Sequence, residues 1–300
     1  MSYQFIIADV FTTTAFGGNQ LAIFPDARGL SDRAMQALTR EFNFAESTFV
    51  LPPNDPRHTH RLRIFTPGME VPFAGHPTVG TAAALVHLGL VEATDGAATV
   101  VFEENVGPIA VEVRLDGDST RAQFTLETRI EDPGAGPDLV DAAAVLSTPR
   151  AEVLDAWFAS AGMRFCFVRL TDRAAVDRAV LDRAVWSAHF AGAWSPHIYF
   201  FAGDTRSDGV LYARMFAPTL GIAEDPATGS ACAALAGALA DRLPEHEGAF
   251  AWRIEQGVAM GRPSLIETKS EKRNGRAATI KVGGSTVIVG EGAITIPLPY

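Results

Sequence analysis

A nine-residue segment occurs twice in this chain, and this repeat limits the possible folds more than any other feature. The segment HPTVGTAAA (76–84) aligns without a gap with DPATGSACA (225–233), at an offset of 149 residues in a chain of 300. A Phe-x-Pro sequence precedes both copies, at Phe65 and at Phe216. Proline followed by small residues also begins unrelated helices. A gapless match at half the chain length, however, indicates two copies of one structural unit.

The repeat predicts two similar domains, residues 1–130 and 131–300, which meet at the Pro- and Gly-rich run EDPGAGPDLV. In each copy a strand and a loop lead into a helix that is small or apolar on nearly all sides, which is typical of an enclosed helix. The predicted fold class is α+β, with two pseudo-symmetric domains. Each is a mostly antiparallel sheet or half-barrel wrapped around a buried central helix. We expect the C-terminal strand, about residues 290–300, to pack back on the first domain.

Local signals place several helices more closely. Ser31 is a preferred N-cap for an amphipathic helix from Asp32 to Phe42. The run DRAAVDRAVLDRAVWSAHF (172–190) predicts one helix. In both copies of the repeat we expect the proline, Pro77 or Pro226, at the first helical position, where its missing N–H costs least.

Composition narrows the class of partner. The formal net charge is −10 with acidic and basic residues interspersed, which argues against nucleic acid or an anionic membrane as a partner. No apolar run is long enough to span a bilayer and no basic leader precedes one, so we expect a cytoplasmic protein. The chain has two cysteines and no clustered metal-ligand motif or Gly-rich phosphate loop, so we expect no metal and no nucleotide cofactor.

The two helix starts predict where a substrate would bind. Backbone N–H groups of a helix's first turn and the helix dipole favour an anion, so we expect a site for a substrate carboxylate in a cleft between the two domains. His76 and Asp225 directly precede the two prolines and could reach into that cleft as titratable groups. Each could equally be a helix cap that bonds only its own turn.

Glu46 is the third titratable candidate. It lies in EFNFAESTFV, at the start of a predicted strand, where glutamate is disfavoured unless it has a partner. The flanking Phe44 and Phe49 could desolvate it and raise its pKa toward the range of a general base. Alternatively it is a solvated residue at a strand end. An offset of 151 residues places His197 opposite Glu46 in the repeat, either as a second titratable group or as a core histidine.

Five segments together resemble the phenazine-biosynthesis isomerase-like family, whose members share the diaminopimelate epimerase fold. They are DVFTTTAFGGNQLAIF, EFNFAESTFV, RIFTPGMEVPFAGHPTVGTAAAL, EDPATGSACAAL and EQGVAMGRPS. The resemblance covers essentially the whole chain. It implies a cofactor-free enzyme, usually a homodimer, with two pseudo-symmetric domains, in which a glutamate moves a proton between carbon atoms.

The resemblance also assigns residues. It implies catalytic roles for Glu46, His76 and Asp225. The residues that it assigns to substrate binding are Asn19, Gly75, Gly229 and Ser230. One departure from the family pattern is Gln20, where proline is frequent, and it affects the expected loop shape.

The predicted function is therefore a cofactor-independent isomerase or epimerase that acts on a small carboxylate-bearing metabolite. A cofactor-free lyase would use the same residues, and a non-catalytic dimeric small-molecule-binding protein would keep the cleft without needing Glu46. Related epimerases use one cysteine from each domain. Here Cys232 aligns with Ala83 inside the helix, which argues against a two-thiol racemase.

Overall fold

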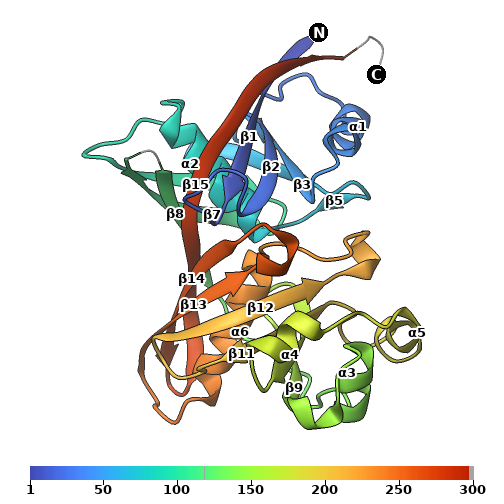
Figure 1. Ribbon diagram of the computed structural model, residues 1–300. Helices are drawn as coiled ribbons and strands as arrows, with labels where there is room; N and C mark the ends of the chain where they lie inside the picture. The colour runs from blue at the N-terminus through green and yellow to red at the C-terminus, as the bar shows by residue number, and fades with distance from the viewer. Residues whose placement is uncertain (118, 297–300) are drawn as a thin grey trace. The chain divides into compact units, whose positions relative to one another are not determined.

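The computed structural model describes residues 1–117 and 119–296 (Figure 1). The chain forms two compact units. Unit 1 consists of Met1–Thr125 and Gly283–Tyr300, and unit 2 consists of Leu126–Val282. The long strand β15 (Arg276–Thr295) therefore contributes its first residues to unit 2 and the remainder to unit 1.

Unit 1 is built on a sheet that closes on itself. The strands are β1 (Ser2–Val10), β2 (Asn19–Phe24), β3 (Glu46–Leu51), β4 (His60–Phe65), β5 (Glu70–Val71), β6 (Ala97–Glu104), β7 (Gly107–Asp116) and β8 (Ser119–Glu127). The order is β1-β2-β3-β4-β6-β7-β8-β15, and β15 pairs in turn with β1. Figure 1 shows β15 running alongside β1. The register pairs Ser2 with Thr295, and residues 297–300 of the predicted C-terminal strand lie outside the described residues.

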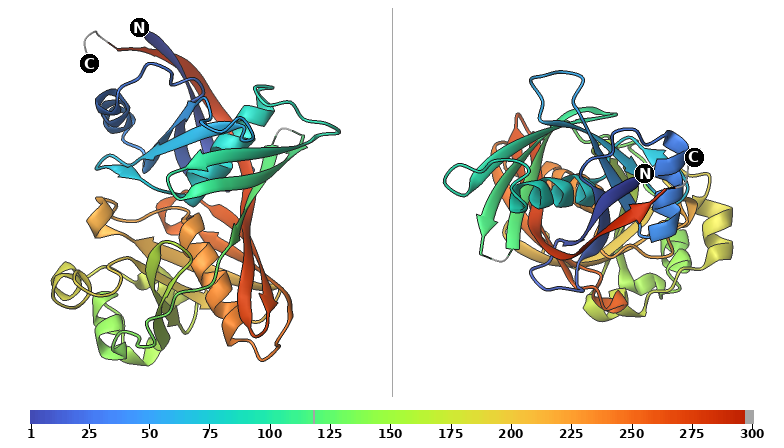
Figure 2. Two further views of the ribbon diagram at one scale, coloured as in Figure 1. Left: turned by 180° about the vertical axis from the view of Figure 1, so that it is seen from behind. Right: turned by 90° about the horizontal axis from the view of Figure 1, so that it is seen from above.

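Helix α2 (Gly75–His87) is enclosed by the strands of unit 1. It packs against β1, β2, β3, β6 and β7 (Figure 2). Every residue of the helix except its last is buried. Gly80 sets how closely the helix approaches the sheet. A Cβ atom there would lie 2.5 Å from Val10 Cγ2 and 2.8 Å from Leu21 Cδ2. Helix α1 (Asp32–Phe42) has the predicted bounds, with Ser31 as its N-cap, and Met35 and Leu38 contribute to a separate core cluster with Phe49 and Phe65.

Unit 2 repeats the same arrangement. Its strands are β9 (Val153–Ser160), β10 (Arg164–Leu170), β11 (Ile198–Gly203), β12 (Gly209–Phe216), β13 (Gly248–Gln256) and β14 (Ser264–Arg273), in the order β15-β14-β13-β12-β11-β10-β9. Its helices are α3 (Leu139–Val145), α4 (Arg173–Arg178), α5 (Arg183–Val185) and α6 (Gly229–Arg242), with short helical turns at Arg150–Glu152, Trp186–Phe190, Pro218–Leu220 and Val258–Met260. Helix α6 is the enclosed helix and packs against β9, β10, β13 and β14.

The pairing pattern supports the repeat read from the sequence. In unit 1 the parallel pairs are β2–β3 and β4–β6, and in unit 2 they are β10–β11 and β12–β13. The neighbouring pairs β3–β4 and β11–β12 are both antiparallel. The predicted α+β class, a mostly antiparallel sheet around a buried helix, is confirmed.

Two helix predictions were wrong. The stretch 172–190 is not one helix, because the amides of Val180 and Asp182 bond to the carbonyls of Leu146 and Val145 and so interrupt the helical ladder. The prolines of the repeat are not at the first helical position either. Helix α2 already begins at Gly75, two residues before Pro77, whereas α6 begins at Gly229, three residues after Pro226.

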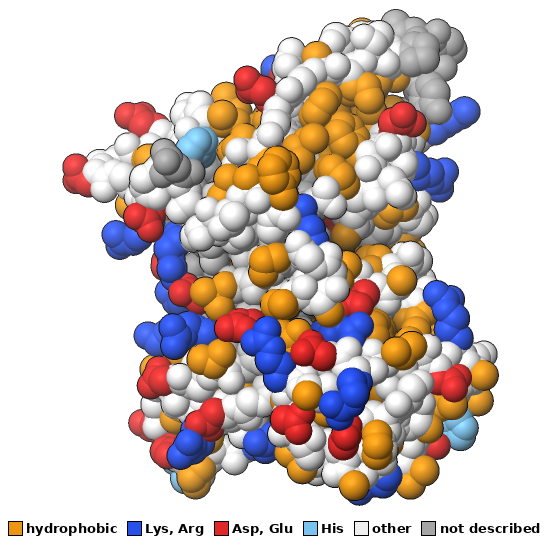
Figure 3. All heavy atoms as spheres, in the orientation of Figure 1, with side chains coloured by type: hydrophobic (Ala, Val, Ile, Leu, Met, Phe, Trp, Pro, Cys, Tyr) orange, Lys and Arg blue, Asp and Glu red, His pale blue; other side chains and the backbone are white. Residues whose placement is uncertain are grey.

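Basic and acidic side chains are interspersed on the face seen in Figure 3, and hydrophobic side chains gather on its upper part. Several of the exposed charges form local ion pairs, including Arg28 with Asp26 and Arg206 with Asp204. Among the described residues, no helix combines the length and apolar character that a bilayer crossing requires.

Candidate active site

Three of the predicted site residues meet inside unit 1. Glu46 is the first residue of β3, His76 is the second residue of α2 and Asn19 is the first residue of β2. The Asn19 Nδ2 atom lies 3.3 Å from His76 Nδ1, and His76 Nε2 lies 3.6 Å from Glu46 Oε2. The side chains of His76 and Glu46 are 4% and 13% exposed. Glu46 is therefore a largely buried carboxyl beside an imidazole.

The surroundings of His76 indicate its charge. Its Nδ1 lies within hydrogen-bond distance of the Asn19 amide, and its Nε2 faces Glu46. Burial lowers the pKa of His76 to about 3, and a backbone hydrogen bond at Gln20 opposes this by less. His76 is thus a neutral N–H donor at physiological pH. The 3.6 Å distance between His76 Nε2 and Glu46 Oε2 is longer than a hydrogen bond. Catalytic hydrogen bonds are often this long in enzymes without substrate and shorten when the substrate binds.

A buried hydrogen bond fixes β3 against α2 beside this cluster. The hydroxyl oxygens of Thr48 and Thr81 lie 2.9 Å apart, and both residues are fully buried. Thr48 is two residues after Glu46, so its side chain lies on the same face of the strand. Gly75, the first residue of α2, is also buried.

The second cluster lies at the start of α6, in unit 2. The Thr228 hydroxyl donates to Asp225 Oδ2 at 2.5 Å, and the Gln256 amide nitrogen donates to the Asp225 carbonyl at 2.8 Å and to Thr228 Oγ1 at 3.0 Å. Gln256 Oε1 in turn accepts from the Thr228 backbone N–H at 3.2 Å. These bonds hold the stretch Asp225–Thr228 in a non-helical conformation, which explains why α6 begins only at Gly229.

Gly229 and Ser230 are the first two residues of α6, so their backbone N–H groups belong to its first turn. The Ser230 side chain is half-buried, and its Oγ lies 3.9 Å from Met163 Sδ. Asp225 is 7% exposed and precedes the helix by four residues. It is therefore not the N-cap, which is Thr228.

The strand registers confirm that His197 is the counterpart of Glu46. Ser47 pairs with Phe65 in unit 1, and Ile198 pairs with Phe216 in unit 2, so the preceding residues are Glu46 and His197. Burial lowers the pKa of His197 to about 4, and its Nδ1 lies 3.4 Å from Thr219 Oγ1. Within unit 2 His197 therefore has the contacts of a neutral core histidine.

The thiols are inert in this arrangement. Cys166 and Cys232 are both fully buried, and burial raises the pKa of Cys232 to about 12. Cys232 Sγ lies 3.3 Å from the Tyr199 hydroxyl, which donates to Gln256 Oε1. In the described part of the chain, His, Cys, Asp and Glu side chains form no group that could hold a metal ion.

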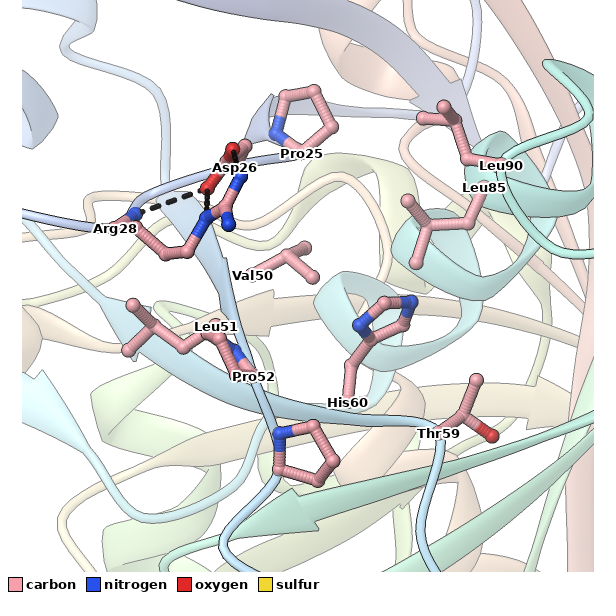
Figure 4. Close-up of a pocket in the computed structure, with 11 residues that line it drawn as sticks. Pro25, Asp26, Arg28, Val50, Leu51, Pro52, Thr59, His60, Leu85 and Leu90 are labelled. Carbon is pink, nitrogen blue, oxygen red and sulfur yellow. Dashed lines mark hydrogen bonds and ion pairs between the residues drawn. The ribbon is translucent and has the colours of Figure 1, made fainter. Parts of the chain in front are cut away.

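A cavity of about 370 Å³ opens elsewhere on unit 1 (Figure 4). It is lined mainly by Pro25, Val50, Leu51, His60 and Leu85. Val50 and Leu51 end the strand that Glu46 begins, so the cavity lies toward the opposite end of β3 from the Glu46–His76 cluster. The carboxylate in its lining, Asp26, is exposed and forms an ion pair with Arg28, so we do not assign the reaction to this cavity.

Comparison with known proteins identifies the family. The family described as "Phenazine biosynthesis-like protein" matches residues 8–292. This chain belongs to that family. An uncharacterized isomerase of Mesorhizobium japonicum is 39% identical over 98% of this chain and 99% of its own length. The trans-2,3-dihydro-3-hydroxyanthranilate isomerase of Pseudomonas chlororaphis is 35% identical over 98% of this chain and 100% of its own length.

A solved structure supports the fold of this family member. The crystal structure of the Bacillus anthracis phenazine biosynthesis protein of the PhzF family superposes with a TM-score of 0.83, covers 99% of this chain and 100% of its own, and is 23% identical. The fold and the named relatives together make this phenazine biosynthesis-like protein an isomerase.

Sequence analysis missed two polar residues beside the helix starts of this family member. Gln256 lies within EQGVAMGRPS but was not assigned a role, and Glu104 lies in the corresponding strand of the first unit. Aligning FEENVG (102–107) with IEQGVA (254–259) would have found the pair.

Proposed function

We propose that this isomerase moves a proton between two carbon atoms of a small carboxylate-bearing metabolite, with Glu46 as the acid/base. The observation that carries this proposal is the buried Glu46 carboxyl, whose Oε2 lies 3.6 Å from the Nε2 of a neutral His76 that Asn19 contacts on its other ring nitrogen. A carboxylate can take a proton from one carbon and, once protonated, return it to another. Atoms and charge balance without any cofactor.

Each neighbouring group has a role in the proposal. His76 Nε2–H orients the Glu46 carboxylate and stabilises negative charge that develops as the substrate carbon loses its proton. The first-turn N–H groups of Gly229 and Ser230, the Ser230 hydroxyl and the backbone at Gly75 bind the substrate carboxylate. Asp225, held by Thr228, assists proton transfer from the second unit. The repeat and the family likeness support the use of both helix starts on one substrate.

Relatives suggest where to look for the substrate. One relative is named for its action on trans-2,3-dihydro-3-hydroxyanthranilate, a cyclic unsaturated amino acid. We propose that the substrate of this chain belongs to the same chemical class, a small cyclic or unsaturated amino acid. The relatives named as isomerases favour catalysis over a purely binding role.

Hydrogen exchange in deuterated water tests the proposal. The wild type and the Glu46→Gln variant are each incubated with trans-2,3-dihydro-3-hydroxyanthranilate and with other unsaturated amino acids, after binding has been measured for each. We expect deuterium at carbon in the wild type only, with substrate mass otherwise conserved. Release of a leaving group would instead identify a lyase. Equal exchange by Glu46→Gln, or no exchange with any compound that binds, would refute the role of Glu46.

The homodimer implied by the family resemblance remains a prediction. Sedimentation velocity of the purified chain checks it. A single species with twice the chain mass of 32.0 kDa is the expected result.

A further inference from the structure

Glu104 is a buried carboxyl that the proposed proton transfer does not use. It is the last residue of β6, is 7% exposed, and its Oε1 lies 2.6 Å from Thr78 Oγ1 on α2. Thr78 belongs to the segment Ala74–Thr78, which we call the α2 start and which carries Gly75 and His76. Glu104 therefore contacts the turn that presents His76 to Glu46.

The hydrogen bonds of Thr78 indicate which group carries the proton. Its hydroxyl has one hydrogen, and the oxygen lies 2.8 Å from the Ala74 carbonyl and 2.6 Å from Glu104 Oε1. The Ala74 carbonyl can only accept, so the Thr78 hydrogen goes to it if both bonds form. Glu104 must then donate, which only the protonated carboxylic acid can do.

Burial favours the same protonation state. Among the residues that the structure describes, Glu104 Oε2 has no hydrogen-bond partner. An ionised Glu104 would therefore leave a charged oxygen desolvated, which costs several kcal/mol, on the order of a buried charge without a partner. Burial accordingly raises the pKa of Glu104 to about 8; a bond that Thr78 donates to the carboxylate lowers it by less, and a bond that Glu104 itself donates would not lower it.

The second unit has an amide at the corresponding position. In unit 2 the register pairs Leu211 with Ile254 and Ala213 with Gln256, and in unit 1 it pairs His60 with Phe102. With Phe65 matched to Phe216, His60 corresponds to Leu211, so Phe102 corresponds to Ile254 and Glu104 to Gln256. Gln256 donates to Thr228 Oγ1, and the Thr228 hydroxyl donates to Asp225 Oδ2.

We propose that Glu104 is a positioning residue that acts as a neutral carboxylic acid, donating to Thr78 and so holding the α2 start in the conformation that places His76 beside Glu46. Loss of its proton reverses the hydrogen bond and puts a buried charge against the first turn. Alkaline pH therefore destabilises the α2 start. The matching segment of unit 2 is held by an amide, which does not titrate, and is not affected.

No opposite charge near Glu104 offers another explanation. Its pKa shift has only two causes, burial and Thr78. Helix α2 carries His76 and His87, and His60 lies on the same face of β4 as Glu104 does on β6, whereas Arg61 and Arg63 of β4 alternate with that face. The charged side chains of β7, Glu112, Arg114 and Asp116, are exposed, and its buried positions are Ile109, Val111 and Val113. Burial lowers the pKa of both His76 and His60, which keeps them neutral at alkaline pH.

Infrared difference spectroscopy tests the protonation state without reference to activity. A protonated carboxylic acid has its own carbonyl stretch, which an ionised carboxylate lacks. We expect this band in the wild type at pH 6.5, its loss at pH 9.5, and its absence from Glu104→Gln at both values. Glu103→Gln is the matched control, because the pKa of Glu103 is lowered to about 2, chiefly by its hydrogen bond with His58. A band unaffected by Glu104→Gln would overturn the proposal.

Stability against pH gives a second, independent readout. The pKa of Glu104 is about 8 in the folded state, against an ordinary value of 4.5 in the unfolded state. Its contribution to the free energy of unfolding is therefore fully present below pH 4.5 and is lost as pH rises from 4.5 to 8. Relative to Glu104→Gln, the unfolding constant of the wild type should rise by up to about tenfold per pH unit between pH 5.5 and 7.5. A ratio that stays constant over this range would contradict a buried neutral acid.

The link to catalysis rests on the proposed function and is measured last. We expect the exchange activity of the wild type to fall above pH 8, because only the protonated form of Glu104 orients His76 correctly. Glu104→Gln should retain activity and should lack this alkaline limb, the fall in activity above pH 8. If the spectroscopic and stability results hold but the limb persists in Glu104→Gln, the positioning role is wrong while the protonated state stands. If the wild type exchanges no substrate hydrogen, the proposed function fails instead.

Discussion

The starts of the two enclosed helices derive from one repeated motif, yet they differ in what holds them. At the α2 start the helix begins at Gly75, before the proline, and its polar neighbours are the titratable Glu46, His76 and Glu104. At the α6 start the helix begins at Gly229, after the proline, and the amide of Gln256 makes the corresponding contacts. The repeat thus conserves the packing of the helix and leaves the chemistry of its first turn free to diverge.

This difference has a physical origin in the donors available at each position. An amide supplies two N–H hydrogens at every pH, so Gln256 can bond both the Asp225 carbonyl and Thr228 and keep that stretch non-helical. A carboxylic acid supplies one, and Thr78 is then free to close the first helical turn onto Ala74. The side chains at this position therefore differ in the number of hydrogens that they donate and in whether they titrate.

The largest expected effect tests whether the two units contribute unequal chemistry. Glu46→Gln should lower the exchange rate by on the order of 10³-fold, because a carboxamide cannot accept the substrate proton. The replacement of its counterpart, His197→Gln, should cost less than about tenfold, below the range of a general base. Single-turnover exchange rates for both variants provide the measurement. Equal losses would remove the asymmetry between the units.

Gln256→Glu places in unit 2 the group that unit 1 carries. We expect a loss of about 2–4 kcal/mol in the free energy of unfolding, since the Asp225 carbonyl and Thr228 lose their donors in a fully buried site. Urea unfolding at pH 7 measures it. An undiminished stability would mean that the amide is not what distinguishes the α6 start.

His76 makes the α2 start sensitive to acid as well. Its pKa is about 3 when folded against an ordinary value of 6.5, so its contribution is complete above pH 6.5 and is lost as pH falls toward 3. Between pH 6.5 and 5 the wild type should lose about 2 kcal/mol relative to His76→Gln. Urea titrations at these two pH values compare the variants, and parallel pH dependences would show that His76 can be protonated without unfolding.

Gly80→Ala tests the close packing of α2. The added Cβ would meet Val10 and Leu21 side-chain atoms at 2.5 and 2.8 Å, so we expect a destabilisation of about 1–2 kcal/mol, in the range of overpacked cores. Gly192→Ala is the control, because its Cβ would meet no atom within 4 Å, and its stability should change by less than about 0.5 kcal/mol. Thermal unfolding measures the stability of both variants, and equal stabilities would show that Gly80 does not set the close packing of α2.

Cys232→Ala should have the smallest effect. The buried thiol, whose pKa is raised to about 12, contacts Tyr199 but is not part of the proposed proton path. We expect unchanged exchange activity, a stability loss of about 1 kcal/mol and very slow alkylation of the wild type in the folded state. Loss of activity on alkylation of this cysteine would revive a thiol-based mechanism.

The amino-acid sequence by itself determined the repeat, the α+β class and the enclosed helices, because these depend on residue patterns along the chain. Small or apolar residues on nearly all sides of α2 leave no polar face, and Ser31 followed by an amphipathic run marks α1 to the residue. Glu46 and His76 were named from local motifs and Asn19 from the family resemblance, and the structure brings the three side chains together in unit 1.

Only the tertiary structure decided features that depend on a partner distant in the chain. The segment 172–190 breaks because Val180 and Asp182 bond to the end of α3, and α6 starts late because Gln256 lies 28 residues after Thr228 in sequence but bonds to it. The proton on Glu104 likewise follows from Thr78 and from burial, neither of which a local pattern encodes. Sequence patterns specify which elements form, whereas buried hydrogen bonds between elements specify where they begin and which groups keep their protons.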